Sequence, residues 1–272
     1  MLSRKDLHAY QHRAVSFIRD RRRCGLFLDM GLGKTSSALT AVSDLLDEFS
    51  VHKVLIVAPL RVANSVWKQE AKKWAHLKHL KVSVCTGSQK ARMVALQADA
   101  DIFVINRENI PWLVEKGPTK WPFDMVIIDE SSSFKSASSR RFKALRHILP
   151  KTEYVVLLTG TPSPNGLLDV WSQMYLIDFG QALGRTMSAF KQRFFEPDYM
   201  GYKFTPREGS ADKIHNLMAP RVIHMSAEDY LDLPERIDLI ERVDMQPAAL
   251  EAYNDFEKAM FTELEGGEEV EA

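Results

Sequence analysis

The sequence contains few cysteines and no long apolar segment, and each absence excludes a class of protein. Its two cysteines, Cys24 and Cys85, cannot form a disulfide framework, and their spacing is not that of a zinc site. No apolar run approaches the roughly 18 residues of a membrane-spanning helix. The N-terminus has no apolar region typical of a secretory signal. We therefore expect a protein of the reducing cytoplasm that has no membrane partner.

The composition is that of an ordinary globular protein, but the charge is unevenly distributed. Hydrophobic residues make up 45% of the 272 residues and charged residues 26%, which excludes a wholly disordered chain. The net charge is zero, yet residues 1–150 carry 25 basic and 14 acidic side chains, whereas residues 151–272 carry 11 and 22. This asymmetry is equally consistent with one face that binds a polyanion and with two solvated faces of opposite sign.

Short apolar segments alternate with helical patterns over the first 160 residues. The expected strands are residues 25–28, 54–58, 82–85, 102–105, 125–128 and 154–158. Helical patterns occupy the intervals between them and also the N-terminus, where residues 7–23 carry an apolar stripe at helical spacing. This alternation predicts βαβ units in an α/β fold, with a parallel central sheet covered by helices on both faces.

The pattern changes after about residue 165, where strand signals fade. We expect helices over residues 167–177 and 187–195. The stretch that follows, residues 196–212, is rich in Pro, Gly and Asp and predicts a loop or an insertion. The last residues, 263–272, are acidic, contain a Gly-Gly pair and are typical of a frayed end or a linker.

The strongest chemical signal is the string Asp-Met-Gly-Leu-Gly-Lys-Thr at residues 29–35, which follows an expected strand and opens an expected helix. In that context its glycines allow backbone N–H groups to close around phosphate oxygens at a helix N-terminus. Lys34 would reach the β- and γ-phosphates, and the Thr35 hydroxyl would bind Mg²⁺. The general motif has a further glycine where this chain has Leu28, so the match is imperfect. The strand–loop–helix context nevertheless favours a phosphate-binding loop.

Two further segments end apolar strands with polar residues. Asp129 and Glu130 follow the strand at 125–128, where one carboxylate can hold Mg²⁺ and the other can activate a water. Alone, such a pair is more often a helix cap or a solvated turn. Together with the phosphate-binding loop, the metal-binding and water-activating roles become the favoured interpretation. The segment Thr159-Gly160-Thr161 follows the strand at 154–158, and by itself it is equally consistent with a plain strand-to-helix turn.

Taken in chain order, these segments resemble the motifs of a superfamily 2 helicase or translocase of the Swi/Snf type, in a phage or bacterial version. The segment 29–35 resembles motif I, residues 129–132 motif II and residues 158–162 motif III. Other parts of the resemblance are Leu7, Tyr10 and Gln11 (the adenine-reading Q motif), Ala58-Pro59-Leu60 with Trp67 and Trp74 (motif Ia), Thr86-Gly87 (motif Ib), and Leu217, Pro220-Arg221 and Leu233-Pro234 (the exit from the first lobe).

The resemblance implies a RecA-like ATP-binding lobe over residues 1–240, in which residues 1–24 form the Q-motif helix and residues 165–240 a helical extension. Residues 241–272 would begin the connection to a second RecA-like lobe that the chain does not contain. The implied reaction is ATP hydrolysis with Mg²⁺, coupled to movement on double-stranded DNA. The location would be the cytoplasm of a bacterium or of a phage-infected host.

The resemblance also assigns roles to single residues. Catalysis is expected from Lys34, Asp129 and Glu130, and Mg²⁺ binding from Thr35 and Asp129. Nucleotide binding is expected from Gln11, Met30, Gly31, Leu32, Gly33, Lys34, Thr35 and Ser36. Contacts to nucleic acid are expected from Pro59, Leu60, Arg61, Thr86 and Asn106. Coupling between the two sites is expected from Thr159, Gly160 and Thr161.

One departure bears on that coupling. The family has Asp-Glu-Ala-His at motif II, and this chain has Asp-Glu-Ser-Ser, so the histidine that often links motif II to motif III is replaced by Ser132. The serine hydroxyl can still donate one hydrogen bond. The carboxylates of Asp129 and Glu130 are retained, so the departure affects the coupling more than the hydrolysis.

Alternatives remain open from the sequence. The chain can be a nucleotide-gated binding module with little turnover of its own, or an unrelated phosphate-loop ATPase or kinase, although the order of the motifs disfavours the latter. The resemblance favours translocation on duplex DNA over strand separation, and RNA remains a possible substrate. The basic run 21–23 is consistent with phosphate contacts or with a helix C-terminus, and Trp67 and Trp74 are expected to be core residues.

Overall fold

The computed structural model describes residues 2–201, 203–230 and 245–265. The chain divides into a large unit that extends to Asp232 and a second unit that begins at Leu233. The described part of the second unit is the helix α11 (Pro247–Glu265), in which Leu250, Tyr253 and Phe256 are exposed. The expected lobe boundary at residue 240, the Leu233-Pro234 pair and residues 266–272 of the acidic end lie outside the described residues.

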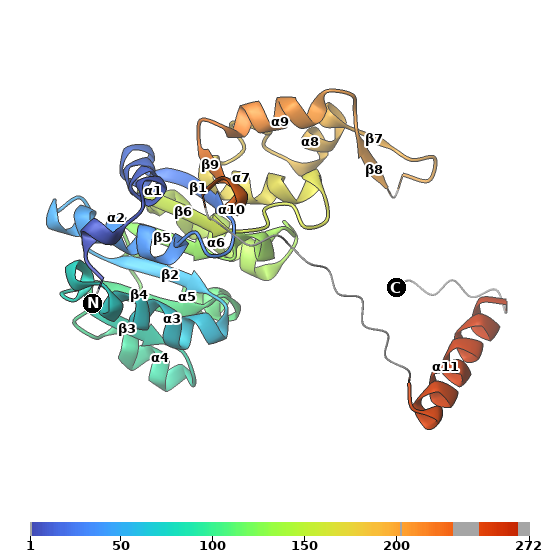
Figure 1. The fold of residues 1–272 in the computed structure, drawn as a ribbon, viewed down its shortest axis with the longest axis horizontal. Helices are drawn as coiled ribbons and strands as arrows, with labels where there is room; N and C mark the ends of the chain where they lie inside the picture. Colours follow the sequence, from blue (N-terminus) through green and yellow to red (C-terminus); the bar gives the residue numbers. More distant parts are fainter. Residues whose placement is uncertain (1, 202, 231–244, 266–272) are drawn as a thin grey trace. The chain divides into compact units, whose positions relative to one another are not determined.

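A seven-stranded parallel sheet forms the centre of the large unit (Figure 1). Its strands lie in the order β3-β4-β2-β5-β6-β1-β9. Their bounds are β1 (Arg23–Leu28), β2 (Val54–Ala58), β3 (Val82–Cys85), β4 (Ile102–Asn106), β5 (Met125–Asp129), β6 (Tyr154–Thr159) and β9 (Val222–Met225). The four strands β2, β4, β5 and β6 are buried at every position, as expected for a parallel sheet covered on both faces.

Helices cover both faces of the sheet because successive strand side chains point to opposite sides. One face, which includes Leu26 and Ile56, packs against α1 (Ala9–Arg21), α2 (Lys34–Asp47) and α3 (Leu60–Lys73). The other face, which includes Phe27 and Leu55, packs against α5 (Ile110–Lys116), α6 (Arg140–Ile148), α7 (Val170–Asp178), α8 (Met187–Phe194) and α9 (Ser210–Met218). The short helix α4 (Gln89–Leu96) contacts β3, and α10 (Ala227–Tyr230) follows β9.

Two thiols are part of this core. Cys24 in β1 and Cys85 at the end of β3 are both free and fully buried. Burial raises the pKa of the Cys24 thiol to about 12 and that of Cys85 to about 11. Both therefore behave as small apolar side chains at neutral pH.

The α/β fold with a parallel sheet is confirmed, and three local expectations are corrected. A seventh strand, β9, pairs with β1 although no strand was expected after residue 165. The expected loop at 196–212 contains a hairpin of β7 (Phe195–Pro197) and β8 (Phe204–Pro206) and the first turn of α9. The N-terminal helix ends at Arg21, because Arg22 has a φ of 56° and the next residue already begins β1.

The parallel arrangement brings the ends of the strands to one edge of the sheet. The loops after β1, β5 and β6 hold the three segments assigned to motifs I, II and III, and these strands are neighbours in the order β5-β6-β1. The loops after β2, β3 and β4 are adjacent to each other in the other half of the same edge. Among the described residues, no helix is long and apolar enough to cross a bilayer.

Candidate functional site

A hollow of about 360 Å³ lies where the loops after β1 and β5 meet the helix α3. It is lined by Met30, Gly31, Gly33, Lys34, Thr35, Ser36, Val62, Val66, Glu70, Asp129 and Glu130. The structure therefore brings together motif segments that are almost a hundred residues apart in the sequence. Sequence analysis did not anticipate the contribution of α3, whose Val62, Val66 and Glu70 form one wall.

The phosphate-binding loop, residues 29–35, depends on glycine at two positions. Gly31 has a φ of 89°, and Gly33 has a φ of 69° as the N-cap of α2. A side chain at Gly33 would also meet Gln11, because a Cβ built there lies 2.1 Å from Gln11 Nε2. Leu32 is fully buried, so only its backbone can contribute to a nucleotide site, and Met30 is exposed.

Gln11 lies directly against this loop although it comes from α1. Its Nε2 donates to Ser36 Oγ at 3.3 Å, and its Oε1 accepts from the backbone N–H of His8 at 2.9 Å. The residue is 5% exposed. The structure thus brings the expected adenine-reading residue and the phosphate-binding loop together, and it holds the amide in one orientation.

Lys34 is held at the end of β1 by backbone carbonyls. Its Nζ donates to Leu28 O at 2.7 Å and to Asp29 O at 3.1 Å. Burial lowers the pKa of Lys34, and the negative charges of Glu130, Asp129 and Asp29 oppose this effect. Within the part of the chain that the structure describes, the amine makes no direct hydrogen bond to a carboxylate. Phosphate oxygens can therefore replace its carbonyl partners.

Asp129 is a buried carboxylate held from two sides. Its Oδ2 accepts from Trp67 Nε1 at 3.2 Å, and its Oδ1 accepts from the backbone N–H of Glu130 at 3.0 Å. Burial, followed by the charge of Glu130, raises the pKa of Asp129 to about 6. Trp67 is fully buried in the core, as expected. Its contact with Asp129 was missed, because the two residues are 62 positions apart and no spacing rule relates them.

Glu130 follows β5 in a left-handed backbone conformation, with φ 51° and ψ 54°. For a residue with a Cβ this conformation costs roughly 1–3 kcal/mol, and it persists only where the surroundings enforce it. The next four residues, Ser131–Phe134, form a 3₁₀ turn. The backbone thus places two consecutive carboxylates at the wall of the hollow.

Replacing Asp129 with asparagine is expected to stabilise the protein at neutral pH when Mg²⁺ and nucleotide are absent. The pKa of Asp129 is about 6 in the folded protein, against about 3.9 in an unfolded chain. The raised pKa means that the protonated carboxyl stabilises the fold fully below about pH 4, and this stabilisation is lost as the pH rises through about 6. We expect Asp129→Asn to raise the free energy of unfolding by about 1–2 kcal/mol at neutral pH, with a gain that shrinks toward pH 4. Urea titrations in EDTA measure this difference, and equal stabilities at neutral pH would contradict it.

The segment 159–161 contacts the phosphate-binding loop from the neighbouring strand. Thr159 is fully buried, and its Oγ1 accepts from the backbone N–H of Thr161 at 3.1 Å. Gly160 lies against the end of β1, since a Cβ built there would be 3.4 Å from Leu28 O and 3.6 Å from Lys34 Nζ. Gly160 is therefore the residue of this segment that lies beside the lysine of the loop.

The residues expected to contact nucleic acid lie in the other half of the edge. Pro59 is the N-cap of α3, and Leu60 and Arg61 are exposed in its first turn. Thr86 Oγ1 donates to Asn64 Oδ1 at 2.7 Å, which ties the loop after β3 to α3. Asn106 is only 6% exposed, and its amide bonds to Glu108 and Asn109, so it orders the turn after β4.

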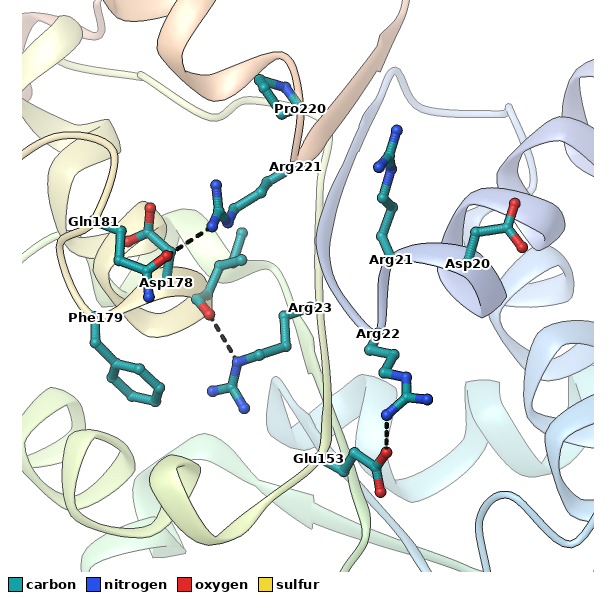
Figure 2. Close-up of a pocket in the computed structure, with 11 residues that line it drawn as sticks. Asp20, Arg21, Arg22, Arg23, Glu153, Asp178, Phe179, Gln181, Pro220 and Arg221 are labelled. Atoms are coloured by element: carbon teal, nitrogen blue, oxygen red, sulfur yellow. Dashed lines mark hydrogen bonds and ion pairs between the residues drawn. The ribbon is translucent and has the colours of Figure 1, made fainter.

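A second hollow, of about 640 Å³, lies at the opposite edge, where β1 begins, and four arginines line it. Figure 2 shows that three of them already have partners. Arg22 pairs with Glu153, Arg23 donates to Ile177 O at 2.8 Å, and Arg221 donates to a glutamine at 2.8 Å. Burial lowers the pKa of Arg23 to about 10. Arg22 thus ties the beginning of β1 to that of β6, and Arg23 ties it to α7, so these two residues of the basic run have a structural role.

The hollow at the ends of β1 and β5 fits Mg²⁺ bound with a nucleotide. Mg²⁺ prefers oxygen ligands and usually binds through one or two carboxylates together with phosphates and waters. Asp129 and the Thr35 hydroxyl both line this hollow and supply such oxygens. In the described part of the chain, no group of three or more His, Cys, Asp and Glu residues forms a separate metal cluster.

Both the sequence and the fold of this chain are similar to those of known proteins. A family model described as the SNF2-related domain matches residues 10–272. A putative protein, p41, of Acyrthosiphon pisum secondary endosymbiont phage 1 is 38% identical over 274 residues, which cover 97% of this chain and 59% of that protein. The CHD3-type chromatin-remodeling factor CHR7 of Arabidopsis thaliana is 28% identical over 91% of this chain and 20% of its own length.

A similar solved structure is the SWI2/SNF2 ATPase core of Sulfolobus solfataricus in complex with double-stranded DNA. It is 25% identical, with a TM-score of 0.69, and the match covers 97% of this chain and 55% of that one. The chain thus spans less than two thirds of the length of each of these three proteins.

Proposed function

Because the chain belongs to the SNF2-related domain family, as the N-terminal RecA-like lobe of a Swi/Snf-type ATPase, we propose that it is the ATP-binding half of a motor that moves on duplex DNA. We place this lobe in residues 1–240, with residues 165–240 as its extension. One observation carries the proposal: the loop with Lys34 and the pair Asp129–Glu130 line one hollow, and Gln11 contacts that loop.

In this proposal the side chains around the hollow divide the work of ATP hydrolysis. Gln11 recognises adenine through its oriented amide, and the loop glycines and Lys34 bind the phosphates. Thr35 and Asp129 would hold Mg²⁺, which neutralises charge on the phosphates when it is bound. Glu130, which lines the hollow, would accept a proton from the attacking water.

The loops after β2, β3 and β4 would contact the DNA backbone. Leu60 and Arg61 are exposed there, and they share a sheet edge with the ATP hollow. The archaeal SWI2/SNF2 core, which this chain resembles, was solved with double-stranded DNA. Contacts to phosphates carry no sequence information, so we expect binding without sequence preference that weakens as salt increases.

A second RecA-like lobe would complete the motor. In phosphate-loop enzymes an arginine supplied from outside the nucleotide site is worth about 10³–10⁵ in rate, so the isolated chain should bind ATP and turn it over slowly. A nucleotide-gated binding module with little turnover is the second candidate. It is supported by the fact that the chain matches only 59% of the phage protein and 55% of the archaeal ATPase core.

The test is steady-state ATP turnover by the natural full-length protein, beside the 272-residue chain. Each is measured without nucleic acid and with duplex DNA, single-stranded DNA or RNA, at low and high salt. We expect duplex DNA to stimulate the full-length protein most and the stimulation to fall with salt. Tight Mg-ATP binding without turnover in the full-length protein would favour the binding module. Turnover that no nucleic acid changes would contradict the motor.

A further inference from the structure

A buried hydrogen-bond chain connects the segment after Glu130 to the segment after Thr161. Ser131 Oγ donates to Gln173 Oε1 at 2.8 Å, and Gln173 Nε2 donates to Pro162 O at 2.5 Å. Ser131 and Gln173 are both fully buried. One side chain from α7 thus bridges the loops that follow β5 and β6.

This bridge connects motif II to motif III, which is the connection that the family often makes with the histidine that this chain lacks. Ser132 was expected to replace the missing histidine, but the structure gives the hydrogen bond to its neighbour, Ser131. Ser131 is the first residue of the 3₁₀ turn and directly follows the left-handed Glu130. A hydrogen bond at Ser131 therefore fixes the backbone on which the carboxylate of Glu130 depends.

The bridge is stiff because both ends of the Gln173 amide are used inside the core. A buried donor or acceptor that loses its partner costs about 1–3 kcal/mol. A displacement of Pro162 therefore either moves Gln173 and Ser131 with it or pays that cost. Asp169 O, which also accepts from Gln173 Nε2 at 3.2 Å, holds the amide to the start of α7.

We propose that Gln173 is a positioning residue that transmits movement of the loop after β6 to Glu130 through Ser131. The inference rests on the proposed function, because it assigns to this bridge the coupling between DNA binding and ATP hydrolysis. Gln173 is fully buried and does not line the hollow. Its effect is exerted through Ser131 and Pro162.

The chain offers a matched control in Ser172. It is as deeply buried as Ser131, and its Oγ donates to Lys135 O at 2.8 Å and to Asp169 O at 3.4 Å, but it bonds to no member of the bridge. Ser172→Ala and Ser131→Ala each remove one buried hydroxyl, so their effects on stability should be similar. Gln173→Leu replaces the amide with an apolar side chain of comparable size. The double variant Ser131→Ala/Gln173→Leu removes both members of one hydrogen bond.

The first experiment measures basal and DNA-stimulated turnover of these variants in the natural full-length protein. We expect Ser131→Ala and Gln173→Leu to reduce the stimulation by DNA about threefold to tenfold, with a smaller effect on the KM for ATP. The double variant should lose no more than the worse single variant, since coupled residues are not additive. Ser172→Ala should retain the wild-type ratio. An unchanged ratio in both bridge variants, or an equal loss in Ser172→Ala, would overturn the proposal.

A second experiment does not depend on DNA. Hydrogen–deuterium exchange should rise around Pro162 in Ser131→Ala and around residues 129–133 in Gln173→Leu, and at neither place in Ser172→Ala. Exchange confined to the mutated end would show that the bridge transmits nothing. If DNA does not stimulate the wild-type protein, that result contradicts the proposed function but not the bridge. The exchange pattern then tests by itself whether the bridge connects the two loops.

Discussion

Replacing Glu130 with glutamine is expected to lower ATP turnover by about 10²–10⁴, because the variant loses the group that we propose takes a proton from the attacking water. Binding of Mg-ATP should persist. Glutamine has the shape of glutamate, so the backbone strain at this position is unchanged. The negative charge of Glu130 contributes to the raised pKa of Asp129. Its removal lowers that pKa and leaves the metal-binding carboxylate ionised to lower pH.

A second glutamate at the same hollow provides the control. Glu70 lines the hollow from α3, where its Oε1 accepts from Trp74 Nε1 at 2.7 Å. If any carboxylate near the nucleotide were sufficient, Glu70→Gln would reduce turnover as strongly as Glu130→Gln. We expect a change within about threefold for Glu70→Gln, because it has no place at the end of β5. Single-turnover rates and nucleotide affinities of both variants separate chemistry from binding, and comparable losses would contradict the role of Glu130.

Replacing Gly33 with alanine is expected to weaken ATP binding by at least about tenfold, which corresponds to roughly 1.4 kcal/mol. Two effects combine at this position. The φ of 69° costs an alanine about 1–2 kcal/mol. The new Cβ, at 2.1 Å from Gln11 Nε2, would also displace the Gln11 amide and break its bond to Ser36. The variant should therefore lose preference for adenine over other bases as well as affinity, as titrations with ATP and GTP can measure.

Gly209 separates these two effects. It is also the N-cap of a helix, α9, with a φ of 65°, and a Cβ built there meets nothing within 4 Å. Gly209→Ala should lose about 1–2 kcal/mol of stability from its backbone conformation and keep wild-type nucleotide affinity. If both alanine variants lose ATP binding equally, the contact between Gly33 and Gln11 has no role in it.

The sheet and the loops at its edge could be predicted from the sequence because they depend on local patterns. Continuous apolar runs such as Val54–Ala58 identify buried parallel strands, and polar residues at their ends identify a shared edge. β9 lacked such a signal, since it lies at the edge of the sheet and alternates a buried Ile223 with an exposed His224. The hairpin β7–β8 was hidden by prolines, which break strand patterns but are tolerated in edge strands.

The contacts that orient the site could not be predicted from the sequence. Trp67 bonds to a carboxylate 62 residues away, and Ser131 bonds to an amide 42 residues away. No periodicity relates such pairs, because they meet only after helices have packed on the sheet. Gln173 illustrates this limit, since a glutamine in an apolar helical pattern gives no indication that it is fully buried.

The burial of Cys24 and Cys85 has a practical consequence for following motion in this protein. Alkylating dyes react with the thiolate, and both native thiols are held protonated and inside the core. A cysteine introduced at an exposed position, such as Tyr199 at the tip of the hairpin, would therefore carry the fluorophore alone. Distances between the labelled lobe and a labelled partner, such as the duplex DNA that we propose it binds, then become accessible to fluorescence without removing either native cysteine from the core.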